Sequence, residues 1–221
     1  MGHDAEPQTP RQKADWTHWH RAYDDPSSYL ARRLEVVQEQ LRLAIDGKAG
    51  RLRMVSMCAG QARDVVGALA GHARSVEIEA RLVELDPGNV DVAWAGVCAA
   101  GLDGIDVVCA DAGVSDSYAG AVPADIILAC GVFGNIPDGD VRRTIEFLPH
   151  LSAPGAVVIW TRGREPERDF PLTIRGWFAE CGFEELAFVA PSDARFRVGV
   201  HRLEREPRPF QAGVRLFSFL W

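Results

Sequence analysis

The chain has 221 residues, of which 47% are hydrophobic and 25% are charged, a composition typical of one globular domain with a sizeable core. Its formal net charge of -7 argues against a protein that binds nucleic acid through the phosphate backbone. The polar N-terminus lacks the apolar region of a signal peptide, and no run of about 18 apolar residues is present. We therefore expect a cytoplasmic protein without nucleic-acid or membrane partners.

The chain is predicted to have three parts. Residues 1–14 are polar and are expected to be disordered. Residues 15–50 are expected to form an N-terminal helical lid segment. In it an aromatic stretch, WTHWHRAY, precedes apolar residues at helical spacing: Leu30, Leu34, Val37, Leu41 and Ile45. Residues 51–221 are predicted to form one α/β domain.

Short apolar segments alternate with helical ones through most of this domain. Strands are expected at 52–57, 80–86, 105–110, 124–130 and 156–161, and helices at 63–72, 89–100, 138–149 and 172–181. This alternation is typical of a parallel sheet covered by helices on both faces. Three more strands, at 183–191, 196–203 and 216–221, have no helices between them. The expected fold class is a Rossmann-like doubly wound sheet, mostly parallel, with an antiparallel C-terminal edge.

The stretch MVSMCAGQARD (54–64) connects the first strand of this domain to its first helix. A dinucleotide fingerprint, G-x-G-x-x-G, aligned on Gly60 puts Arg63 where a glycine lets helix and strand approach closely. The frame G-x-G-x-G falls instead on the small residues Cys58, Gly60 and Ala62. A ligand-binding turn of this second kind is therefore feasible, and an ordinary strand-to-helix turn is the alternative.

With this second frame, residues 28–203 resemble class I (Rossmann-like) S-adenosylmethionine (SAM)-dependent methyltransferases. The chain departs from that family at Ser56, where an acidic residue is usual, and at Cys58 and Ala62, where glycines are usual. The resemblance implies a seven-stranded sheet and SAM as the cofactor. No metal site is expected, because none of the five cysteines has metal-ligand spacing.

Two carboxylates follow the second and third strands. Asp86 is placed to accept hydrogen bonds from two ribose hydroxyls, or to cap the helix that begins near Pro87. By resemblance, Asp111 would meet the exocyclic amine of adenine; a solvated turn aspartate is the alternative.

The loop ACGVFGN (129–135) follows the fourth strand and by resemblance would lie near the sulfonium of SAM. Phe133 would turn its ring face to that cation, or pack in the core. Tyr29 and Arg33 would contact the SAM carboxylate. The expected cofactor-binding set is Tyr29, Arg33, Ser56, Cys58, Ala59, Gly60, Asp86, Asp111, Ala112, Cys130, Gly131 and Phe133.

No catalytic residue is assigned from the sequence. Methyl transfer from a sulfonium depends mainly on proximity, and a base is needed only when the acceptor must lose a proton. The candidates are His20, Tyr23, Asn135 and His201, with a structural role as the alternative for each.

Three functions remain open. The first is a SAM-dependent methyltransferase with a small-molecule acceptor. The chain is acidic, and the fourth strand is not followed by the DPPY-like tetrapeptide that base-modifying methyltransferases of nucleic acids often carry. The second is a protein of the same fold that binds SAM or S-adenosylhomocysteine (SAH) without methyl transfer, as a binding module or as the catalyst of a rearrangement. The third is an NAD-dependent oxidoreductase, which leaves the antiparallel ending and Arg63 unexplained.

Overall fold

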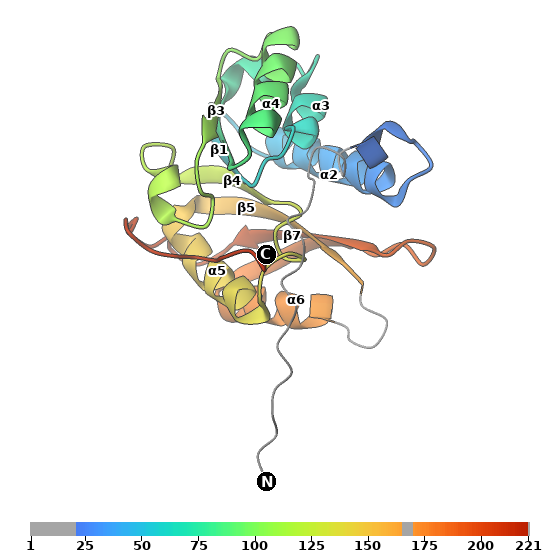
Figure 1. Ribbon diagram of the computed structural model, residues 1–221. Helices are drawn as coiled ribbons and strands as arrows, with labels where there is room; N and C mark the ends of the chain where they lie inside the picture. The colour runs from blue at the N-terminus through green and yellow to red at the C-terminus, as the bar shows by residue number, and fades with distance from the viewer. Residues whose placement is uncertain (1–20, 165–169, 221) are drawn as a thin grey trace.

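The structure is a computed structural model that describes residues 21–164 and 170–220 (Figure 1). Seven strands form one sheet in the order β3-β2-β1-β4-β5-β7-β6. The strands are β1 (Leu52–Met57), β2 (Ile78–Glu84), β3 (Ile105–Cys109), β4 (Ala124–Ala129), β5 (Ser152–Gly163), β6 (Phe183–Val189) and β7 (Phe196–Leu203). β1 to β5 pair in parallel, whereas β7 runs antiparallel to both β5 and β6. The predicted fold class is confirmed.

Helices cover both faces of this sheet (Figure 1). They are α2 (Tyr29–Asp46), α3 (Arg63–Leu69), α4 (Pro87–Ala99), α5 (Asp138–Leu151) and α6 (Phe170–Glu180), with short 3-10 turns η1 (Arg21–Asp24), η2 (Ser75–Glu77) and η3 (Ser115–Tyr118). A hydrophobic core lies on each face of the sheet, and β1 contributes residues to both. Leu52 and Met54 pack on the face that α2 covers, whereas Val55 and Met57 pack on the face that α5 covers. Both faces of the central strands are therefore buried, as the apolar runs predict.

α2 is the amphipathic helix that the spacing of apolar residues predicts. Ser28 caps its N-terminus, because the Ser28 hydroxyl accepts a hydrogen bond from the Ala31 N–H. Its buried residues Val37, Leu41 and Ile45 lie four positions apart and pack on the same face of the sheet as α3. The disordered tail predicted for residues 1–14 lies outside the described residues, and so does the start of the predicted lid segment.

The predicted strand at 216–221 is wrong for residues 216–220, which form no strand. The apolar residues of this segment pack instead on loops at the carboxyl end of the sheet, where one isolated bridge joins Val114 and Arg215. Leu216 and Phe217 are fully buried there. An apolar run at the end of this chain therefore marks burial without a neighbouring strand.

In the described ranges, no helix is long and apolar enough to cross a membrane.

Candidate functional site

A cavity of about 670 Å³ lies where β1, β2, β3 and β4 end. Each strand contributes a residue at or just after its last position: Cys58, Glu84, Asp111 and Cys130. The sheet order reverses between β1 and β4, and ligands of doubly wound sheets bind at such a switch point. The volume falls in the range of small-molecule sites.

The loop after β1 has the backbone that the G-x-G-x-G frame requires. Cys58, Gly60 and Ala62 have φ of 52°, 55° and 56°, in the left-handed region that glycine tolerates best. Two non-glycine residues there cost about 1 kcal/mol each. The loop is held in spite of this cost, because the Ala59 N–H donates to the Val83 carbonyl (2.9 Å) and the Ala62 N–H donates to the Ala59 carbonyl (2.8 Å).

Glu84, at the end of β2, holds this loop in place by hydrogen bonds. The expected cofactor-binding set does not include it. Its Oε2 accepts from the Gly60 N–H (2.8 Å) and its Oε1 accepts from the Asp86 N–H (2.9 Å). Asp86 in turn caps α4, since its Oδ1 accepts from the Asn89 N–H (2.9 Å). Both carboxylates line the cavity. Strand periodicity could have indicated Glu84. Side chains two positions apart on a strand point to the same side, and Glu84 lies two positions before Asp86 in the predicted strand 80–86.

The loop after β3 brings Asp111 and Ala112, two of the expected cofactor-binding residues, to the cavity wall. Asp111 Oδ1 accepts from the Gly113 N–H (2.8 Å), a turn that aspartate often makes. Its Oδ2 lies 2.5 Å from Nη1 of Arg215. The Asp111 carboxylate is therefore fixed in place at the edge of the cavity.

The loop after β4 contributes Cys130, Gly131 and Asn135 to the cavity. The Gly131 N–H donates to Thr161 Oγ1 (2.8 Å), and Asn135 Nδ2 donates to the Gly131 carbonyl (2.6 Å). Arg162 donates to the carbonyl of Phe133. Burial raises the pKa of the Cys130 thiol, so this thiol stays protonated at neutral pH.

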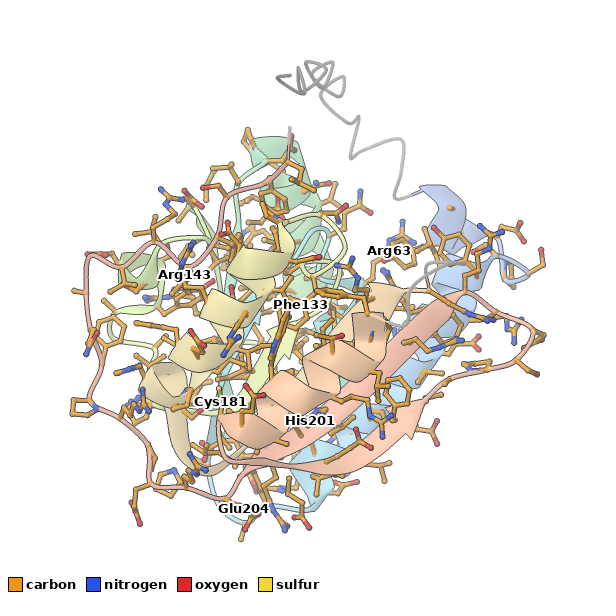
Figure 2. The ribbon with its side chains drawn as sticks, turned by 90° about the horizontal axis from the view of Figure 1, so that it is seen from below. Arg63, Phe133, Arg143, Cys181, His201 and Glu204 are labelled. Atoms are coloured by element: carbon orange, nitrogen blue, oxygen red, sulfur yellow. The ribbon has the colours of Figure 1, made fainter. Side chains whose placement is uncertain are left out.

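The N-terminal side of the cavity is built by η1 and α2. Arg33 Nη2 donates to the Tyr23 hydroxyl at 2.5 Å, and both residues line the cavity. Arg63 Nη1 lies 2.7 Å from Asp24 Oδ1, and its guanidinium lies 5.6 Å from the centre of the Tyr23 ring. Figure 2 shows Arg63 beside this N-terminal turn. These contacts hold η1 against the residues that follow the β1 loop.

Buried ionisable groups gather on the same side. Burial raises the pKa of Tyr23 and also that of Asp64, another lining residue. The Tyr23 hydroxyl therefore remains a hydrogen-bond donor at neutral pH. Among the described residues, no group of three or more His, Cys, Asp or Glu could hold a metal ion.

Three predicted cofactor residues do not line the cavity. Phe133 is fully buried, and its ring centre lies 6.0 Å from that of Trp160 in the α5-side core. Ser56 is buried within β1, two residues before the point where the chain reaches the cavity. Tyr29 is 53% exposed at the start of α2, whereas Arg33, one turn further on, faces the cavity.

His201, a catalytic candidate, is also remote from the cavity. β7 runs antiparallel to β5 and places His201 opposite Val158, away from the carboxyl end of the sheet. The imidazole stacks 4.2 Å from the Phe178 ring of α6, and its Nδ1 accepts from Trp160 Nε1 (3.1 Å). Burial lowers the His201 pKa to about 4. His20 lies outside the described residues.

Several solved structures have the fold of this chain at low sequence identity to it. Magnesium protoporphyrin IX methyltransferase from Synechocystis PCC 6803, with bound SAM, matches at a TM-score of 0.63 and 13% identity, over 88% of this chain and 100% of that one. An O-methyltransferase family protein from Burkholderia thailandensis matches at 0.63 and 16%, over 85% of this chain and 61% of that one. The cyclase SpnF matches at 0.55 and 13%, over 79% and 82%.

No protein-family model and no curated protein sequence matches the chain. The O-methyltransferase family protein is longer than the region shared with it, since the chain spans 61% of its length. In this chain the matched fold is a seven-stranded sheet in which β7 runs antiparallel to its neighbours. The chain has the fold of the class I SAM-dependent methyltransferases.

Proposed function

We propose that this protein is a SAM-dependent methyltransferase that acts on a small-molecule acceptor. The observation that carries the proposal is the composition of the cavity wall. A left-handed turn follows β1, the carboxylates of Glu84 and Asp86 lie at the end of β2, and Asp111 follows β3. A turn of this kind lets a ligand approach the backbone, and the carboxylates suit the donor groups of an adenosine. The residues present therefore fit SAM.

Each part of the cavity has a role in this proposal. Glu84 and Asp86 would accept hydrogen bonds from the ribose hydroxyls, and Asp111 would accept one from the adenine amine, beside Ala112. Arg33 would pair with the carboxylate of the amino-acid end. When bound, SAM supplies a methyl group activated by the sulfonium.

The acceptor end would be formed by the loop after β4. Cys130, Gly131 and Asn135 line the cavity there, and Thr161 holds the loop through the Gly131 N–H. Tyr23 and Asn135, the two catalytic candidates that line the cavity, would orient an acceptor by hydrogen bonds. Because the pKa of Tyr23 is raised, its hydroxyl would donate a hydrogen bond and not act as a base.

An NAD-dependent oxidoreductase is less well supported. Arg63 occupies the third glycine position of a dinucleotide fingerprint, and its side chain is held by Asp24 and Gln61. The antiparallel β7 also departs from the parallel sheet of such enzymes.

A protein that binds SAM or SAH without methyl transfer is the second candidate. The observation that favours it is the likeness to the cyclase SpnF. A cyclase with a similar fold indicates that the fold is compatible with a reaction other than methyl transfer. Cys58 and Ala62 in place of glycines are consistent with it.

An assay of SAH formation tests the proposal. The purified protein is incubated with methyl-labelled SAM and a panel of phenols, amines, thiols and carboxylic acids, with a DNA duplex and a structured RNA for comparison. Acceptor-dependent SAH formation with a small molecule, lost in Glu84→Gln, is the expected result. SAM binding without turnover on any acceptor would favour the second candidate. Absence of SAM and SAH binding would contradict both.

A further inference from the structure

A C-terminal segment returns to the cavity after the sheet is complete. β7 ends at Leu203, and residues 204–220, here named the strap, run back along α5. The Arg208 N–H donates to the Pro149 carbonyl (2.9 Å), and the Pro209 carbonyl lies 2.6 Å from His150 Nδ1. The strap thus crosses from one end of the sheet to the other (Figure 1).

The end of the strap is bound to the loops after β3 and β4, to η3 and to the first turn of α5. Four of its backbone N–H groups donate hydrogen bonds. The Gly213 N–H donates to Asp116 Oδ2 (2.6 Å), and the Leu216 N–H donates to the Gly113 carbonyl (2.8 Å). The Ser218 N–H donates to Asp140 Oδ2 (2.9 Å), and the Leu220 N–H donates to the Asn135 carbonyl (3.2 Å). The strap also lies tightly on Gly113, where a Cβ would come within 2.3 Å of the Phe217 carbonyl oxygen. It is therefore an ordered wall, to which Arg215, Phe217, Ser218 and Phe219 contribute lining side chains.

Arg215 connects this wall to the nucleoside side of the cavity. Its Nη1 lies 2.5 Å from Asp111 Oδ2, while the Gly113 N–H holds Oδ1. The two side chains are 50% and 41% exposed, so the pair contributes little to the stability of the fold. Each carboxylate oxygen can accept more than one hydrogen bond, so the Asp111 carboxylate keeps acceptor capacity for a ligand.

Resting on the proposed function, we propose that Arg215 is a positioning residue that fixes the Asp111 carboxylate for recognition of a 6-aminopurine. The guanidinium and the Gly113 N–H hold the carboxylate from two sides, so one orientation is set before the ligand binds. A carboxylate oriented in advance loses less conformational freedom when it accepts from an exocyclic amine. A segment outside the sheet would then determine which nucleoside the cavity prefers.

Competition with SAH by adenosine and by purine riboside, which lacks the 6-amino group, tests this inference. In the wild type, adenosine should bind more tightly by about tenfold, the effect of one hydrogen bond to a charged group. In Arg215→Met this preference should fall to about threefold or less, with thermal stability unchanged. Arg202→Met is the matched control, because Arg202 pairs with Glu184 and Glu204 on an exposed edge away from the cavity. It should keep the wild-type preference.

A double-mutant cycle separates positioning from direct contact. Asp111→Asn should lower the preference for adenosine as Arg215→Met does, and the double variant should be no worse than either single one, since Arg215 acts through Asp111. An unchanged preference in Arg215→Met, or strictly additive losses, would overturn the inference and leave the proposed function standing. If the wild type does not bind SAH, the proposed function fails and the inference falls with it.

Discussion

The carboxylate of Glu84 and the backbone N–H of Gly60 are joined by a hydrogen bond of 2.8 Å that ties the end of β2 to the loop after β1. The other oxygen of Glu84 holds the Asp86 N–H. One nearly buried side chain thus fixes the turn and the first residue of the next loop together. The local order of the proposed cofactor site depends on it.

Glu84→Gln should therefore weaken both the fold and ligand binding. A glutamine has only one acceptor oxygen and places an NH₂ group against one of the two N–H donors. We expect a loss of about 2 kcal/mol in the free energy of unfolding and at least a tenfold loss in SAH affinity. Asp125→Asn is the control, because Asp125 accepts from the Arg53 N–H at an exposed site away from the cavity. Equal effects of the two variants in urea unfolding would disprove the role of Glu84.

Asp86→Asn separates helix capping from ligand binding. Asparagine caps a helix as well as aspartate does, so the free energy of unfolding should change by less than about 0.5 kcal/mol. A ribose bound at this carboxylate would lose a charged acceptor, so SAH affinity should fall about tenfold by calorimetry. An unchanged affinity would show that Asp86 only caps α4.

Ala62 should tolerate glycine but not a β-branched residue. Ala62→Gly relieves about 1 kcal/mol of left-handed strain and loses a similar amount of methyl burial, so stability should change by less than about 1 kcal/mol. Ala62→Val should cost about 2 kcal/mol or more. Ala68→Gly, at a buried site of regular α3, is the control and should cost about 2 kcal/mol. If thermal unfolding shows that Ala62→Gly loses as much stability as Ala68→Gly, the backbone at Ala62 is not strained.

Thr161→Val should loosen the loop after β4. The variant keeps the shape of the side chain but leaves the Gly131 N–H without its acceptor, which costs about 1–3 kcal/mol. Thr144→Val is the matched control, because the buried Thr144 hydroxyl donates to a helix carbonyl, that of Asp140. It should cost less than about 1 kcal/mol. Similar losses of stability and of ligand affinity in the two variants would contradict the proposed role of Thr161.

His201 should make stability depend on pH. Burial lowers its pKa to about 4, with Glu185 opposing and Arg175 adding to the shift. Since the unfolded chain takes up this proton near pH 6.5, stability should fall as the pH drops from about 6.5 to 4, by about 3 kcal/mol in total. His201→Gln keeps an acceptor for Trp160 Nε1 and should remove this component. Urea unfolding at pH 7.5 and 5 measures it; parallel losses in the wild type and the variant would disprove the assignment.

The fold and the cofactor-loop frame could be predicted from the sequence because both depend on local patterns. Apolar strands alternate with helices, and the three small residues at Cys58, Gly60 and Ala62 have the left-handed backbone that their spacing suggests. These features need no knowledge of contacts between distant segments.

The strap and the direction of Phe133 could not be predicted in the same way. Residues 216–220 are mostly apolar and follow no predicted helix, which favours an edge strand, and only the tertiary structure shows that they pack on Gly113 and not on a strand. The place of Phe133 in a loop that reaches the cavity favours contact with a ligand, yet its ring packs beside that of Trp160. The direction of a side chain in a loop depends on contacts that spacing does not reveal.

Calorimetric titration of the wild-type protein with SAH and with NAD tests the central claim most directly. The account predicts one SAH site per chain with micromolar affinity and no measurable NAD binding. Binding of NAD in preference to SAH, or binding of neither, would contradict the assignment of this cavity as a SAM site.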